Sequence, residues 1–191
     1  MPGYRLLTRF RRDARGLAAT EFAIILPMIV MMFFGMIEVS TGVAVDRKVT
    51  MLTRTLSDLV SQAAQVNNSD IANAFAVGAA IMTPYSSTPI KAKITQLYID
   101  PKGKTAKVVW SKATSTTSAH SCNDTISVPT GLMITSPSGT YLIMSEVNYD
   151  FKPMVHFKLG ETIPTFPLGD TTFTRPRQSA SVTNSDVTPC T

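Results

Sequence analysis

The sequence predicts an α+β protein with one long N-terminal helix, a second helix and a small antiparallel β-sheet. Three observations support this: a charge-free apolar run at 22–37, an apolar stripe of helical period at 46–65, and β-rich texture after Pro89. We expect four parts: a basic leader (1–16), a transmembrane helix (17–45), an exterior helical region (46–83) and a β-rich exterior domain (84–191).

The first helix is predicted to cross a membrane. A span needs about 20 apolar residues, and the run at 22–37 reaches that length when small flanking residues from Leu17 to Val45 are included. Glu21 and Glu38 would then lie about 26 Å apart, near opposite interfaces. Because the leader is rich in arginine, it is expected in the cytoplasm, with the rest of the chain outside.

Two other topologies remain open from the residues alone. A basic segment before an apolar run is also typical of a secretory signal peptide, which would be cut near Gly42 or Ala44 and release a soluble binding module. The apolar run is longer than a usual signal-peptide core and begins with an acid, Glu21, which argues against this. An uncleaved anchor with no role in a fibre is the third possibility.

Charge and motifs argue against nucleic-acid binding and against catalysis. The net charge is +5, but the leader carries +4 of it, and a nucleic-acid binder needs its basic stripe on the folded domain. His120 and His156 are the two histidines, and neither lies in a metal-spaced cluster. His120-Ser121-Cys122 offers two ligands without a third. We therefore expect no enzyme, no metal and no cofactor.

The exterior helices follow from apolar spacing and breakers. The first helix is predicted to continue to Gln65 with an apolar stripe of Val49, Leu52, Leu56, Leu59 and Ala63. Ser69 is the expected cap of a second helix that ends before Pro84. Its expected packing face consists of Ile71, Ala72, Phe75, Ala76 and Ala79.

The β-rich part contains one clear hairpin, with strands around 94–99 and 107–110 joined by the turn Asp100-Pro101-Lys102-Gly103. Further strands are expected within 141–157 and 173–182. The polar stretch 111–125 is expected to be a surface loop. It holds Cys122, and an even cysteine count in an exported domain favours a Cys122–Cys190 disulfide over two free thiols.

Residues 15–22 (RGLAATEF) carry a resemblance to the cleavage site of type IV prepilins. The resemblance implies that a membrane prepilin peptidase cuts between Gly16 and Leu17 and that Glu21 is the acid at the fifth mature position. In a fibre, Glu21 would pair with the new amine of a neighbouring subunit. The alternative is an interfacial acid that reaches water and has no assembly role.

More broadly, the chain resembles TadE-like proteins of the tight-adherence pilus, with TadF-like proteins similar in size. The resemblance rests on residues 17–30 and the preceding Gly16, on 146–153 (EVNYDFKP) and on Arg175-Pro176-Arg177. It implies a pilin-like architecture and a minor pilin or pseudopilin in the bacterial inner membrane with a periplasmic domain. The implied partners are prepilin peptidase, other pilin subunits and an inner-membrane assembly platform. Arg175 and Arg177 would contact acidic groups on a partner, or else form a solvated edge.

Overall fold

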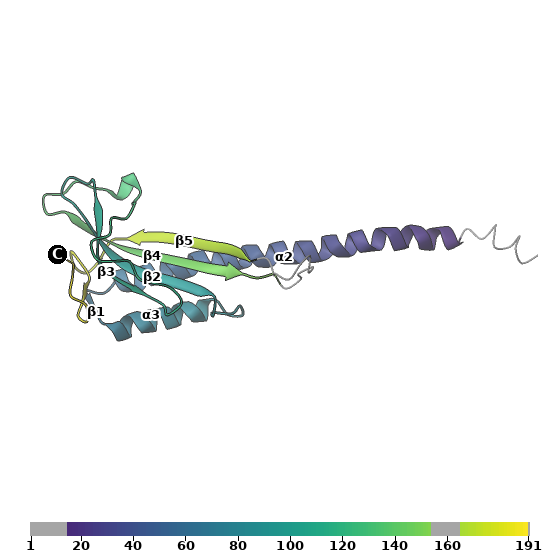
Figure 1. Ribbon diagram of the computed structural model, residues 1–191, viewed down its shortest axis with the longest axis horizontal. Coiled ribbons are helices and arrows are strands. Elements are labelled where there is room, and N and C mark those ends of the chain that lie inside the picture. Colours follow the sequence, from purple (N-terminus) through teal and green to yellow (C-terminus); the bar gives the residue numbers. More distant parts are fainter. Residues whose placement is uncertain (1–14, 154–164, 191) are drawn as a thin grey trace, which may run out of the picture. The chain divides into compact units, whose positions relative to one another are not determined.

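The computed structural model describes residues 15–153 and 165–190, and the chain divides into two compact units between Thr41 and Gly42. Helix α2 (Arg15–Ser61) contributes to both units. The second unit holds the remaining elements of Figure 1: β1 (Gln65–Val66), α3 (Asn68–Ile81), β2 (Ile90–Ile99), β3 (Ala106–Ala113), the 3₁₀ turn η1 (Thr130–Leu132), β4 (Thr140–Phe151), β5 (Phe166–Thr174) and β6 (Thr183–Asn184). The α+β prediction is confirmed.

Within the second unit, α2 buries a stripe at three- and four-residue spacing: Val45, Val49, Leu52, Leu56 and Val60. The predicted stripe is therefore correct at its centre but wrong at Leu59, which is 41% exposed. The helix also ends at Ser61 rather than at Gln65. The reason is tertiary, because Gln65 and Val66 pair in parallel with Thr183 and Asn184 as β1 and β6.

Helix α3 starts with a capping box formed by Asn67 and Asp70. The Asp70 N–H donates to Asn67 Oδ1 (2.8 Å), and the Asn67 N–H donates to Asp70 Oδ2 (3.0 Å). The predicted cap, Ser69, is wrong, because it lies inside the helix whereas Asn67 has the extended backbone that a cap needs.

The buried face of α3 consists of Ile71, Ala74 and Gly78, with Phe75 half-buried beside them. Ala72 and Ala76 are exposed, so their predicted packing role is wrong. A Cβ at Gly78 would lie 2.9 Å from Leu52 Cδ1, so glycine allows α3 to approach α2 closely.

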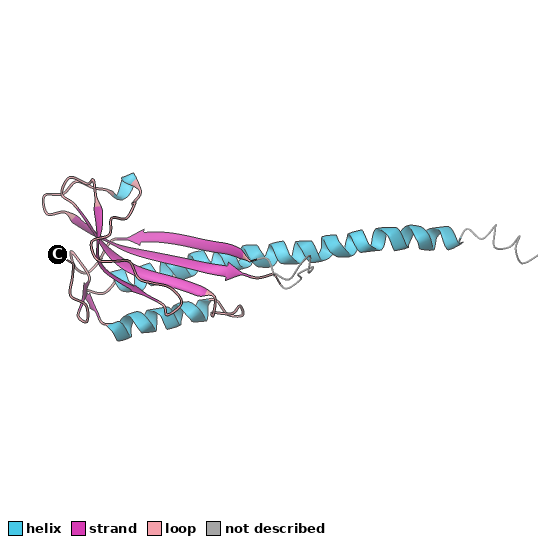
Figure 2. Ribbon diagram, viewed as in Figure 1, coloured by secondary structure: helices cyan, strands magenta, loops and turns pink. Residues whose placement is uncertain are grey.

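The four-stranded sheet has the order β3-β2-β4-β5 and is antiparallel throughout (Figure 2). The predicted hairpin is confirmed as β2 and β3. Its turn places Gly103 at φ +64°, and the Gly103 N–H donates to the Asp100 carbonyl (2.8 Å). A bulge between Gln96 and Leu97 shifts the register of this pair.

The last predicted strand is wrong in its position. Strand β5 covers Phe166–Thr174, whereas the prediction began at Phe173. Pro167 and Gly169 obscured the strand in the sequence, yet both are tolerated because β5 lies at the edge of the sheet. The residues after Thr174 leave the sheet and return to the end of α2, where the Arg177 N–H donates to the Ser61 carbonyl (2.9 Å).

Hydrophobic clusters lie on both faces of the sheet. One face packs against α2 and α3 through Ile94, Trp110 and Ile143, among others. On the other face, Leu97, Val108 and Met144 are covered by apolar residues of the segment 126–133. Tyr149 and Phe151, in the EVNYDFKP stretch, belong to the helix-side cluster and are strand-packing residues.

Candidate membrane segment and processing site

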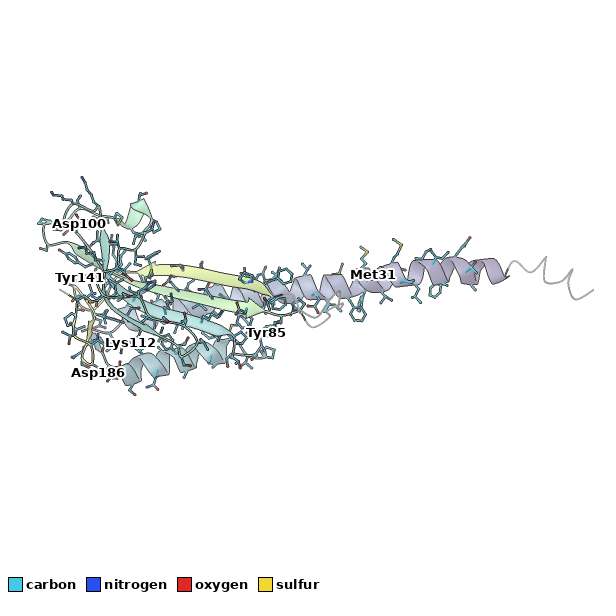
Figure 3. All side chains as sticks on the ribbon, viewed as in Figure 1. Met31, Tyr85, Asp100, Lys112, Tyr141 and Asp186 are labelled. Carbon is cyan, nitrogen blue, oxygen red and sulfur yellow. A yellow bond between two sulfur atoms is a disulfide. The ribbon has the colours of Figure 1, made fainter. Side chains whose placement is uncertain are left out.

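In the first unit, no described residue covers the apolar part of α2. The described side chains from Ala18 to Ile37 are all exposed, and Ile24 and Met32 each reach 72% exposure. Figure 3 shows the side chains projecting from this stretch, with Met31 labelled. A helix that is apolar on every side is stable only when lipid or other helices surround it.

Among the described residues, one helix is long and apolar enough to cross a membrane, and none of its most apolar stretch is buried. This property is shared by membrane anchors and by signal segments. The helix therefore agrees with an N-terminal membrane anchor or signal segment.

The predicted processing residues lie at the start of this helix. Helix α2 begins at Arg15, so the Gly16–Leu17 bond falls in its first turn. Glu21 follows within the next turn and is exposed. It forms no ion pair with any residue that the structure describes. The leader residues 1–14 lie outside the described residues.

The two arginines near the C-terminus have different surroundings. The Arg177 guanidinium forms an ion pair with Asp58 of α2 (Nη2 to Oδ1, 2.5 Å). Together with its backbone bond to Ser61, this pair holds the C-terminal segment on the last turn of α2. Arg175 directly follows β5 and is exposed. The structure thus gives Arg177 an internal partner.

Cys122 and Cys190 form a disulfide with a Cα–Cα distance of 5.6 Å across 68 residues of sequence separation. Cys122 is therefore not a thiolate ligand. His120 instead bonds through Nε2 to the carboxylate of Glu146 on β4. Among the described residues, no group of three or more His, Cys, Asp or Glu side chains could hold a metal ion.

The sequence did not predict the hydrogen bonds that the Lys48 and Trp110 side chains make. Lys48 Nζ donates to the carbonyls of Ile81 and Thr83 (2.8 Å each) and so caps the C-terminal end of α3. The indole of Trp110 donates to the Val182 carbonyl (2.8 Å), deep in the second unit. These partners are 33 to 72 residues apart, and no local sequence pattern signals them.

Two side chains in the second unit have shifted pKa values. Backbone N–H groups of Thr105 and Lys104 donate to Asp100 Oδ1 (2.7 and 2.6 Å) and lower the pKa of that carboxyl. Burial raises the pKa of Tyr149, and the nearby Tyr85 adds to the shift. The shift at Asp100 reflects hydrogen bonds within its turn, and the shift at Tyr149 reflects burial in the core.

A family model described as TadE-like protein matches residues 16–65. This stretch is a TadE-like domain. It begins at Gly16, the residue before the predicted cut, and covers the apolar helix together with the α2 stripe of the second unit. No curated protein and no solved structure matches the chain.

The TadE-like domain implies a role in Tad pilus assembly and an association with the Tad pilus machinery. The TadE-like family is generally non-catalytic. The resemblance first seen in residues 15–30 is thereby confirmed at the level of the family domain.

Proposed function

We propose that this chain is a minor pilin or pseudopilin that takes part in assembly or anchoring of a tight-adherence type IV pilus. In this proposal, residues 1–16 are a cytoplasmic leader, 17–45 cross the inner membrane, and the helical and β-rich regions at 46–83 and 84–191 are periplasmic. The observation that carries the proposal is a TadE-like domain that starts at Gly16 and contains the apolar helix, whose side chains are exposed from Ala18 to Ile37.

Processing gives the N-terminal end its chemistry. A prepilin peptidase cuts after Gly16, whose missing side chain lets the backbone enter the protease cleft. The new amine of Leu17 is positive and lies about one helical turn from Glu21. In an apolar bundle, an unpaired charge costs several kcal/mol, so pairing Glu21 with the amine of the adjacent subunit sets the register between subunits.

The mature N-terminus, sequenced from protein purified from its native host, tests the proposal directly. A start at Leu17 supports prepilin-type processing. A start near Val43 or Val45 would mean a secreted domain and overturn the proposal. An intact leader would leave a membrane-anchored accessory protein that is not processed as a pilin.

Glu21→Ala tests the assembly role separately from processing. We expect the variant to remain in the membrane but to be lost from the pilus fraction, because the neighbouring amine has no acid to pair with. Asp46→Ala is the matched control, since Asp46 is an exposed acid on the same helix. Equal incorporation of both variants would rule out the amine–acid pairing.

A further inference from the structure

The two edge strands of the four-stranded sheet, β3 and β5, differ in their hydrogen bonds to backbone outside the sheet. At the β3 edge, the chain's own backbone supplies partners: the Val108 N–H donates to the Asp124 carbonyl, the Ile126 N–H to Ala106, and the Cys190 N–H to Val109. At the β5 edge, the structure describes no main-chain hydrogen bond to any element beyond the strand. Open edges of this kind are where extended segments of other chains add to a sheet.

The outward groups of β5 can be assigned from one bond. The Thr171 N–H donates to the Asp170 side chain (2.9 Å), so it does not point into the ladder with β4. Because an antiparallel strand alternates between ladder-facing and outward-facing residues, Pro167, Gly169 and Phe173 also face outward. Pro167 has no N–H, and Asp170 accepts that of Thr171. Among the described residues, no backbone group outside the sheet accepts a hydrogen bond from the Gly169 or Phe173 N–H, so these two groups could pair with an added strand.

A groove of about 380 Å³ lies along this edge. It is lined by Arg54, Thr55, Asp58 and Leu59 of α2 and by Thr172 and Thr174 of β5. The Thr174 hydroxyl accepts a hydrogen bond from Ser57 Oγ (2.6 Å), which holds the end of β5 against α2. A strand added to β5 would direct every second side chain toward this helix side of the sheet.

Basic side chains at the groove and along β5 outnumber acidic ones, with Arg54, Arg175 and Arg177 against Asp58 and Asp170. Asp58 is paired with Arg177, whereas Arg54 in the groove and Arg175 at the end of β5 form no ion pair with a described residue. An acidic segment is complementary to Arg54 and Arg175.

We propose that the β5 edge and its groove bind an extended, acidic segment of a partner protein by strand addition, with Asp170 competing for the Thr171 N–H. The inference deepens the proposed function, because it assigns the surface through which a partner subunit binds. It does not depend on processing at Gly16, so the two can fail separately.

The test uses the full chain in detergent micelles and two seven-residue peptides, one alternating valine with glutamate and the other alternating valine with lysine. We expect the glutamate peptide to slow amide hydrogen exchange at Gly169 and Phe173, and to bind at least about tenfold more tightly than the lysine peptide. Equal binding of the two peptides, or no protection at these amides, would overturn the inference.

Two substitutions sharpen the test. Arg54→Glu should weaken binding of the glutamate peptide by about tenfold, whereas Arg47→Glu, an exposed arginine on the same helix, should leave it unchanged. Asp170→Ala frees the Thr171 N–H and should strengthen binding about two- to tenfold. Equal losses in the two arginine variants would contradict a site in the groove. Failure of peptide binding in a protein that starts at Leu17 would remove this inference and leave the pilus role standing.

Discussion

The two parts of helix α2 differ in what covers them, although the helix itself is continuous. Before Gly42 its large apolar side chains are exposed around the whole helix, as at Ile24 and Met32. From Gly42 onward it shows a buried stripe and an exposed outer face of mixed polar and apolar residues, with Leu52 and Leu56 essentially inaccessible. The second part is packed against its own domain, while none of the described residues covers the first part, which needs lipid or other helices around it.

The comparison also separates two uses of apolar surface. In the second part, burial of the stripe is part of the free energy of folding of the domain. In the first part, the same residue types do not contribute to that free energy, and they act only through lipid or neighbouring helices. The same type of substitution should therefore change the stability of the domain when made in the second part, and membrane insertion when made in the first.

Leucine truncation gives the largest expected difference. Leu56→Ala should lower the free energy of unfolding of the second unit by about 2–5 kcal/mol, because it leaves a cavity in the core. Leu26→Ala, in the exposed part, should change it by no more than about 0.5 kcal/mol. Trp110, the single tryptophan, is buried in this core, so its fluorescence during urea denaturation in detergent reports the unfolding. Similar losses in both variants would mean that the two parts fold as one unit.

Introducing a charge should have the larger effect in the first part of α2, and the quantity affected should be membrane insertion. Met31→Lys places a cation about midway between Glu21 and Glu38, and should raise the apparent free energy of membrane insertion by about 2.5–3.5 kcal/mol. Met51→Lys is the matched control, because Met51 is 59% exposed on the outer face of the second part and Met31 is 54% exposed. An insertion assay on both variants tests this. Unimpaired insertion of Met31→Lys would argue against a membrane span here.

A smaller effect is expected at Lys48 of α2, which hydrogen-bonds to the C-terminal end of α3. Lys48→Met keeps the alkyl chain but removes both hydrogen bonds to the carbonyls of Ile81 and Thr83, and should destabilise the second unit by about 1.5–3 kcal/mol. Lys102→Met, at an exposed turn, serves as the control. Urea denaturation would show the difference in midpoint, and equal midpoints would mean that the Lys48 contacts contribute nothing net.

Sequence reasoning succeeded where the determinant is local. The apolar run, the helical spacing through Leu52 and Leu56, and the hairpin turn at Asp100 are each set by residues close together in the chain. The disulfide could be predicted for a different reason, since two cysteines allow a single intramolecular pairing. The Gly16–Glu21 spacing is also local, which is why the family resemblance was visible before any fold was known.

The errors at the end of α2 and in β5 have a common physical cause, because both involve contacts between residues far apart in the chain. Helix α2 ends early where Gln65 joins a strand pair with Thr183, far along the chain. The ion pair between Arg177 and Asp58, 119 positions earlier in the printed sequence, is also long-range, and no charge pattern near either residue predicts it. Strand β5 contains Pro167, which is acceptable only because tertiary structure puts the strand at an edge.

The pH dependence of stability should belong to the second unit and should be the smallest of these effects. Because backbone N–H groups of Thr105 and Lys104 lower the pKa of folded Asp100 below its unfolded value of about 4, the native turn favours the ionised form. Stability from Asp100 is then fully present above about pH 4 and is lost as the pH falls through the folded pKa.

Asp100→Asn keeps an oxygen that can accept these bonds but removes the titration. The urea midpoint of the wild-type chain should therefore fall more steeply than that of the variant below about pH 4, and the two slopes should agree near pH 6. Parallel curves over the whole range would mean that the turn gains no stability from the charge. A steeper fall of the urea midpoint in the variant would require another carboxyl to accept hydrogen bonds from the same N–H groups. Hydrogen exchange at Lys104 and Thr105 would detect that change of acceptor.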